Sequence, residues 1–196
     1  MQPVRIISGT ALPLDRSDVD TDQIIPSDWL KRIERTGFGK GLFSEWRDDR
    51  HFVLNREEYA GASILVAGPN FGTGSSREHA VWALEDYGFR AVVSPRFGDI
   101  FRNNCTKVGL VPVQVTAEEG ERLLRAIEAD PTLELTIDVE RKSLSAPGIG
   151  LETTFPIDDF TAYRLINGFD DVGLTLRHDG FITTFEATRA SWLPTS

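Results

Sequence analysis

The chain has 196 residues, which is enough to bury one sizeable hydrophobic core. Hydrophobic residues make up 40% and charged residues 26%, which is ordinary for a globular protein and excludes disorder as the default. Thirty acidic and 21 basic residues give a formal net charge of -9, which opposes nucleic-acid binding.

The single cysteine, Cys105, excludes an internal disulfide. It also excludes a zinc or iron–sulfur site built from cysteines of this chain alone, so we expect no metal here. No apolar run approaches the roughly 18 residues of a membrane helix, and the first residues lack the zones of a signal peptide. We therefore expect a cytoplasmic protein with no membrane contact.

Glycine, proline and charged residues interrupt any long periodicity in the amino-terminal part of the chain, before Gly61. Residues 18–26 (DVDTDQIIP) and 36–42 (TGFGKGL) are predicted to be loops. Polar loops held beside a strand-based core are common positions for function.

The middle of the chain alternates short apolar runs with helical patterns, as α/β proteins do. Buried strands are predicted at residues 63–67, 91–94 and 110–115. Helices are predicted at residues 75–87 and 97–104, and a third is predicted from Thr116, which forms a capping box with Glu119, to just before Pro131. Gly88 is the expected stop signal of the first helix.

The last third begins with a half-exposed strand, in which Leu133, Leu135, Ile137 and Val139 alternate with polar residues. Residues 141–143 are predicted to turn into a returning strand. Beyond Asp158 the pattern is helical, with breaks expected at Gly168 and Gly180. We predict an α/β fold with a mixed, mainly parallel sheet at residues 1–157, and a C-terminal helical extension at residues 158–196 packed on the same domain.

Residues 68–80 (GPNFGTGSSREHA) join a buried strand to a helix through three glycines. Such a turn lets backbone N–H groups approach an anion at the positive end of a helix. A dinucleotide fingerprint starting at Gly72 would need glycine in place of Arg77, and no Lys-Ser/Thr pair follows the glycines. A hydrolase elbow centred on Ser76 would need glycine in place of Glu78. Nucleotide-binding and hydrolase interpretations therefore fail.

Two serines and an arginine at a helix start are suited to binding a carboxylate. Arg77 offers a bidentate fork, and Ser75, Ser76 and backbone N–H groups can bind the same ligand. Alternatively, Ser75 and Glu78 form a capping box at S-x-x-E spacing, which spacing alone favours. The two interpretations are compatible.

Three segments together strongly resemble the swivelling domain of aconitases and isopropylmalate dehydratases: residues 20–31 (DTDQIIPSDWLK), 74–80 (GSSREHA) and 97–113 (FGDIFRNNCTKVGLVPV). The resemblance covers most of residues 15–115 and implies an aconitase-type swivelling β/β/α domain.

The resemblance also implies roles for individual residues. Ser75 matches the base that takes a proton from the substrate carbon, and Ser76 and Arg77 match substrate-binding residues. Thr21 and Asp22 match the Thr-Asp pair of the earlier motif, with Thr21 toward the substrate and Asp22 as an active-site helper.

Aconitases carry their cluster-binding domains and the swivelling domain on one chain, whereas this chain resembles only the swivelling part. The resemblance therefore implies that a large partner subunit holds a 4Fe-4S cluster and that this chain binds no cofactor itself. The implied reaction is a hydro-lyase reaction on a small hydroxydicarboxylate, which interchanges 2- and 3-isopropylmalate in leucine biosynthesis. A homoaconitase-like small subunit and a non-catalytic anion-binding regulatory module are the alternatives.

Substrate choice is expected to depend on residues 29–38 (WLKRIERTGF). Aconitases resemble this stretch at Trp-Leu-Lys and carry an arginine two positions later that binds the third carboxylate of citrate; an ungapped match places Ile33 there. An apolar wall of Ile33 and Leu30 suits an isopropyl group and would leave a third carboxylate unpaired. Arg32 and Arg35 lie close by, so a shifted register would restore a cation and a homoaconitase-like specificity.

Three further features have simple interpretations. His79 lies four residues after Ser75, but a structural role is favoured over a nucleophile–base pair. Cys105 is expected to pack in the core. The spaced carboxylates of Asp18, Asp20 and Asp22 resemble calcium ligands, yet no glycine or glutamate follows at EF-hand spacing, so calcium is not expected.

Overall fold

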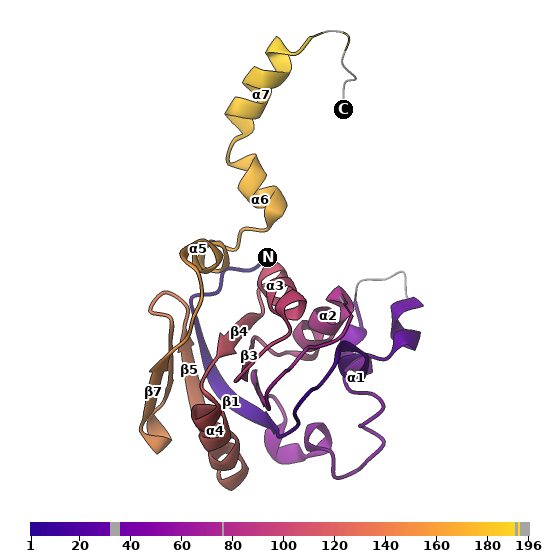
Figure 1. The fold of residues 1–196 in the computed structure, drawn as a ribbon, viewed down its shortest axis with the longest axis vertical. Coiled ribbons are helices and arrows are strands. Elements are labelled where there is room, and N and C mark those ends of the chain that lie inside the picture. Colours follow the sequence, from indigo (N-terminus) through magenta and orange to yellow (C-terminus); the bar gives the residue numbers. More distant parts are fainter. Residues whose placement is uncertain (32–35, 76, 191, 193–196) are drawn as a thin grey trace.

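A single mixed sheet organises the computed structural model, which describes residues 1–31, 36–75, 77–190 and 192. Within these residues the sheet has seven strands in the order β4-β3-β2-β1-β5-β6-β7 (Figure 1). The strands are β1 (Ile6–Leu14), β2 (Ile64–Ala67), β3 (Ala91–Ser94), β4 (Val111–Gln114), β5 (Glu134–Asp138), β6 (Ser143–Ala146) and β7 (Leu151–Thr154).

Strand β1 joins two halves of different character. Its carboxyl-terminal part, residues 11–14, runs parallel to β2, and β3 and β4 continue the parallel half. Its first part, residues 6–10, runs antiparallel to β5, and β6 and β7 continue the antiparallel half. Strands β2 and β3 are buried on both faces, whereas β5 alternates, as parallel and antiparallel sheets respectively require. The α/β class and the mixed sheet are confirmed, but the sheet is not mainly parallel, because parallel and antiparallel pairings are equal in number among the described strands.

The helices are α1 (Thr21–Ile24), α2 (Glu78–Tyr87), α3 (Asp99–Val108), α4 (Ala117–Ala129), α5 (Asp159–Asn167), α6 (Asp171–Leu176) and α7 (Asp179–Thr188). Helices α1 to α4 lie in the connections between strands β1 to β5, and α5 to α7 follow the last strand. Short 3-10 turns are η1 (Ser27–Lys31), η2 (Phe38–Gly41), η3 (Val53–Asn55), η4 (Glu57–Tyr59) and η5 (Pro147–Ile149). Helix α2 packs against α3, and α4 packs on β1, β2 and β3. Among the described residues, no helix combines the length and apolar character needed to cross a bilayer.

The local signals in the middle of the chain are mostly confirmed. The predicted strands agree with β2, β3 and β4 to within one residue at either end. Helix α4 begins with the expected capping box: the Thr116 hydroxyl accepts from the Glu119 N–H, and the Glu119 carboxylate accepts from the Thr116 N–H. The predicted turn at residues 141–143 does lead into β6.

Two helix starts were predicted too early. Helix α3 begins at Asp99 and runs to Val108, rather than covering residues 97–104. Phe97 instead forms a bridge with Phe71, and the Gly98 N–H donates to the Phe71 carbonyl at 2.9 Å. Helix α2 begins at Glu78 and not at Ser75, because the preceding residues are held by another loop, as described below.

The part of the chain before Gly61 contains more regular structure than predicted. Residues 18–26 include helix α1, and residues 36–42 include η2. Strand β1 was not predicted, because Gly9 and Pro13 interrupt its pattern. A Cβ at Gly9 would lie 2.4 Å from the Ser63 Oγ, so the Ser63 hydroxyl would have to move to accommodate a larger residue.

The carboxyl-terminal helices differ in how they pack. Helix α5 buries Ala162 and Leu165, and the Leu165 carbonyl accepts from the Val4 N–H at 2.8 Å. Helices α6 and α7 have no buried residue in the described part of the chain and project away from the sheet (Figure 1). The packing expected for the whole tail is therefore seen for α5 alone, while the division at residues 157 and 158 stays a prediction.

The breaks within the tail were half correct. Gly168 ends α5 in the left-handed conformation, as predicted. Gly180 does not break the tail, because it lies in the first turn of α7, and the second break falls at Arg177 and His178.

A buried glycine in the loop beside α3 provides the first testable prediction. Gly72 has φ +75°, and a Cβ there would lie 2.2 Å from the Phe101 ring. We expect Gly72→Ala to lower the free energy of unfolding by roughly 2–4 kcal/mol, from backbone strain and overpacking together. Gly61 is the matched control, since its φ is +82° and its Cβ would meet nothing within 4 Å, so Gly61→Ala should cost about 1 kcal/mol. Urea unfolding compares them, and equal losses would contradict the packing argument.

Candidate functional site

A ladder of hydrogen bonds ties the loop before α1 to the glycine-rich turn before α2. The Asp18 N–H donates to the Pro69 carbonyl at 2.9 Å, and the Gly72 N–H donates to the Val19 carbonyl at 2.7 Å. The Thr21 N–H then donates to the Thr73 carbonyl at 3.0 Å. Two segments that are distant in sequence are thereby fixed side by side.

The last rung of this ladder holds the backbone of Ser75. The buried Thr21 hydroxyl donates to the Ser75 carbonyl at 2.9 Å. Gly74 lies between Thr73 and Ser75, whose carbonyls accept the two bonds from Thr21, and it has φ +90°, a conformation that glycine adopts without strain. The Ser75 residue itself is exposed to solvent.

An ion pair joins the same two segments beyond the ladder. The Arg77 guanidinium donates through Nη1 to the Asp22 carboxylate. The Arg77 side chain is 20% exposed and that of Asp22 is 55% exposed, so the pair lies at the surface with its arginine mostly covered. A guanidinium has five N–H donors, so Arg77 can hold Asp22 and still bind a second carboxylate.

Helix α2 begins without using Ser75 as a cap. Its N-cap residue is Arg77, which makes no side-chain capping bond. The capping box of Ser75 and Glu78, which spacing alone favoured, is therefore wrong. The physical reason is the ladder, which keeps residues 73–75 in a bridge and a bend outside the helix.

The three carboxylates that were compared with calcium ligands have separate partners. Asp20 caps α1 by accepting from the Gln23 N–H at 2.8 Å, while the Gln23 side chain accepts from the Asp20 N–H at 3.0 Å. Asp18 accepts from the Asn70 amide at 2.7 Å, and Asp22 pairs with Arg77. Asp18, Asp20 and Asn70 hold the site together and were missed as such, although the D-x-x-Q spacing of Asp20 and Gln23 was a usable signal.

The structure thus brings together four of the predicted site residues: Thr21, Asp22, Ser75 and Arg77. Leu30 is half-buried on η1, which begins three residues after α1 ends. The neighbouring Trp29 ring lies against Gly41, where a Cβ would meet it at 2.4 Å. Ser76 and Ile33 lie outside the described residues, as do Arg32 and Arg35.

His79 and Cys105 have the structural roles expected of them. The His79 ring lies 5.3 Å from that of Phe38 and 4.7 Å from that of Trp82, measured between centroids. Cys105 is fully buried in α3, and desolvation raises the pKa of its thiol well above the usual range. Such a thiol is a poor metal ligand, because the thiolate is the form that binds.

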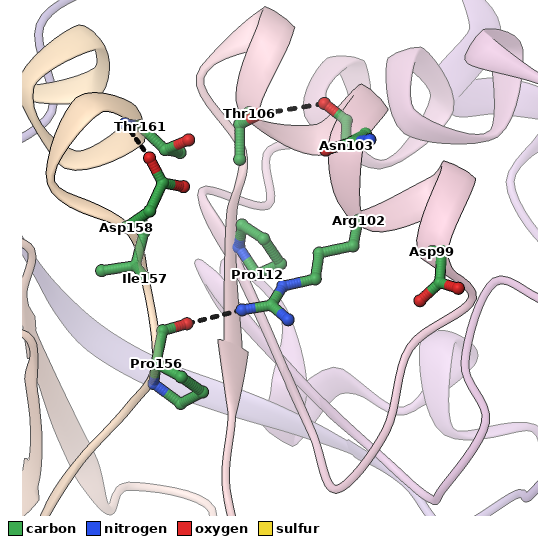
Figure 2. A pocket seen from close by; sticks show the side chains of 9 residues that line it. All are labelled: Asp99, Arg102, Asn103, Thr106, Pro112, Pro156, Ile157, Asp158 and Thr161. Carbon is green, nitrogen blue, oxygen red and sulfur yellow. Dashed lines mark hydrogen bonds between the residues drawn. The ribbon is translucent and has the colours of Figure 1, made fainter.

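A cavity of about 570 Å³ lies elsewhere, between α3, strand β4 and the segment before α5. Figure 2 shows Arg102 crossing it to donate to the Pro156 carbonyl at 2.5 Å, with Asp99 and Asp158 on its walls. The residues that line it are Asp99, Arg102, Asn103, Thr106, Pro112, Pro156, Ile157, Asp158 and Thr161. Ser75 and Arg77 are not among the residues that line it.

Comparison with known proteins gives the family. Residues 1–118 match the model described as the aconitase C-terminal domain, and residues 171–195 match the model for the C-terminal domain of the 3-isopropylmalate dehydratase small subunit. The 3-isopropylmalate dehydratase small subunit of Frankia alni is 64% identical over 196 residues, which is 100% of both chains. The chain belongs to the family of 3-isopropylmalate dehydratase small subunits.

Other members of this small-subunit family agree over the full length. The small subunit of Rubrobacter xylanophilus is 60% identical over 194 residues, covering 99% of this chain and 98% of that one. A crystal structure of 3-isopropylmalate dehydratase from Methanocaldococcus jannaschii is 25% identical, with a TM-score of 0.68 over 91% of this chain and 98% of that one. The aconitase-type fold expected from the three motifs is therefore confirmed.

The hydroxyl of Thr21 provides a test of the ladder in this family's site. Thr21→Val keeps the side-chain shape but removes the bond to the Ser75 carbonyl. We expect it to lower the free energy of unfolding by about 1 kcal/mol, whereas Thr21→Ser, which keeps the hydroxyl, should lose less. Urea unfolding measures both, and a Thr21→Val chain as stable as the wild type would show that the bond contributes nothing.

Proposed function

We propose that this chain acts as the small subunit of a hydro-lyase that interconverts 2- and 3-isopropylmalate by dehydration and rehydration in leucine biosynthesis. The observation that carries the proposal is that the ladder brings the exposed Ser75 close to the ion pair of Arg77 and Asp22. The names of its full-length relatives support the same reaction over the homoaconitase-like and regulatory alternatives. A cytoplasmic location belongs to the same proposal.

In this proposal Arg77 binds a carboxylate of the substrate. Its guanidinium is already oriented by Asp22 and mostly covered, so little side-chain freedom is lost when the ligand arrives. Asp22 acts as a positioning residue that presents the remaining N–H donors outward. Ser76 and Leu30 complete the substrate side, and Ile33 supplies the apolar wall. The buried Thr21 positions Ser75 through its hydroxyl rather than meeting the substrate.

Ser75 serves as the base that removes the carbon-bound proton. Even within the first turn of a helix a negative charge is stabilised by only roughly 0.3–2 kcal/mol, about one pKa unit at 1.36 kcal/mol per unit, and Ser75 lies before the N-cap of α2. That is far too little to make an alkoxide near neutral pH. The larger contribution has to come from Arg77, backbone donors and exclusion of water when another surface covers the site. An exposed Ser75 in the isolated chain is therefore inert.

A large partner subunit is proposed to supply that surface together with a 4Fe-4S cluster. When bound, such a cluster provides a Lewis acid for the hydroxyl that leaves the substrate. This chain does not fit as the protein that binds the cluster. Its one cysteine is buried, and burial raises the pKa of the thiol, which disfavours the thiolate that a cluster needs as ligand. The residues of this chain bind the carboxylate and move the proton.

The base assignment is tested by Ser75→Ala in the assembled enzyme. We expect kcat for 3-isopropylmalate to fall about 10²–10⁴-fold, with assembly unchanged, because the variant removes only the proton acceptor. Steady-state kinetics with the large subunit in excess measures this. Ser145→Ala, on the far strand β6, is the matched control and should keep full activity. A Ser75→Ala enzyme with near-normal kcat would refute the assignment.

The substrate assignment is tested by Ile33→Arg. The added cation should lower kcat/KM for isopropylmalate about 10–200-fold and raise it for a tricarboxylic substrate such as homocitrate, because it would pair the third carboxylate. Arg35→Ile is the companion variant. If Arg35→Ile changes the ratio of the two substrates and Ile33→Arg does not, the shifted register is correct and the specificity assignment fails.

A further inference from the structure

The helices α6 and α7 carry apolar side chains that the described part of this chain does not cover. Val172 and Leu176 on α6 are 66% and 60% exposed, and Phe181 and Phe185 on α7 are 79% and 66% exposed. Each pair is spaced by four residues, so its members share one face of their helix. Two successive helices thus present the anchor pattern of a helix that docks into an apolar groove.

Specific contacts fix the start of this projecting segment to α5. Arg164 on α5 donates to Asp171 on α6 at 2.8 Å, and Asp170 caps α6 by accepting from the Gly173 N–H at 2.6 Å. Arg177, at the end of α6, donates to the Tyr163 hydroxyl and lies with its guanidinium 5.3 Å from the centre of the Phe169 ring. These contacts set the direction in which α6 leaves the sheet, away from the domain (Figure 1).

The boundaries of the family models point to the occupant. The aconitase-type match ends at residue 118, whereas the match named for the small subunit of 3-isopropylmalate dehydratase covers residues 171–195. This second match coincides with α6 and α7 and stops short of α5. The projecting helices are therefore a feature of chains that are small subunits, and such chains need a surface for another subunit.

Charge argues against a second copy of this chain as the occupant. Each copy has a formal net charge of -9, so two copies repel one another. We infer that α6 and α7 form a docking arm that seats the Phe181 and Phe185 face in an apolar groove of the large subunit. This inference rests on the proposed function in one respect, which is the identity of the partner as the large subunit.

Paired variants in the full chain test the docking arm. Phe181→Ser with Phe185→Ser removes the anchors of α7, and Leu176→Ser removes one on α6. Both leave buried positions untouched, so circular dichroism and the melting temperature should match the wild type. Thr183→Ala is the matched control, because Thr183 is exposed on the other side of the same helix.

The dissociation constant for the tagged cluster-bearing large subunit is measured by biolayer interferometry. We expect it to rise about 30-fold or more for the double phenylalanine variant and several-fold for Leu176→Ser, with the Thr183→Ala control unchanged. With the small subunit at saturating concentration, kcat of the double variant should return to the wild-type value. Ser75→Ala should do the opposite, losing kcat while keeping its dissociation constant.

These readouts separate this inference from the proposed function. A double variant that binds within about threefold of the wild type overturns the docking arm and leaves the dehydratase function standing. If the complex assembles only with an intact tail but has no dehydratase activity, the docking arm stands and the proposed function is overturned. If sedimentation shows that the wild-type chain self-associates through the tail and the variants are monomeric, with unchanged binding of the large subunit, the arm serves a second copy and the inference fails.

Discussion

The hydrogen-bond ladder between residues 18–21 and 69–75 is the constraint on which the site depends. It is made of backbone groups and of one side chain, the Thr21 hydroxyl, so its geometry follows from chain conformation rather than from flexible contacts. Two of its residues have a demanding conformation, since Asp18 and Asn70 have φ of 56° and 61°, whereas the left-handed Gly72 and Gly74 adopt theirs without backbone strain. Strained backbone of this kind persists only where surrounding structure determines it, and it is concentrated at functional sites. Here the Asp18–Asn70 bond and the packing of Gly72 on Phe101 provide that support.

The ladder has an electrostatic consequence as well as a geometric one. It places Asp22, at the start of α1, within reach of Arg77, at the start of α2, and so pairs two residues 55 positions apart. An arginine oriented by a carboxylate, beside an exposed hydroxyl, forms a surface suited to an anion that carries a removable proton. In this structure the Ser75 residue and the Asp22 side chain are exposed to water.

The sequence predicted those parts of the fold that depend on local signals. The capping box of Thr116 and Glu119, the stop at Gly88 and the strands around Leu65, Val92 and Val113 depend on neighbouring residues and were found. Strand β1 was missed because Gly9 and Pro13 interrupt its pattern. The start of α2 was placed too early because Ser75 is held by Thr21, a residue distant in sequence, and spacing does not reveal that contact. The grouping of Thr21, Asp22, Ser75 and Arg77 came from the resemblance and not from spacing, which favoured a cap.

The polar site and the apolar tail can contribute differently to the free energy with which this chain associates with another protein. A polar, hydrated surface such as that around Arg77 and Asp22 contributes little to holding two proteins together, because desolvation offsets what the new contacts gain. Apolar surface has to supply the difference. Of the ten large hydrophobic side chains that are exposed in the described residues, five lie between positions 172 and 192. In the proposed assembly, placing that surface on α6 and α7, outside the aconitase-like part, strengthens association without apolar residues intruding on the proposed substrate-binding groups around Arg77.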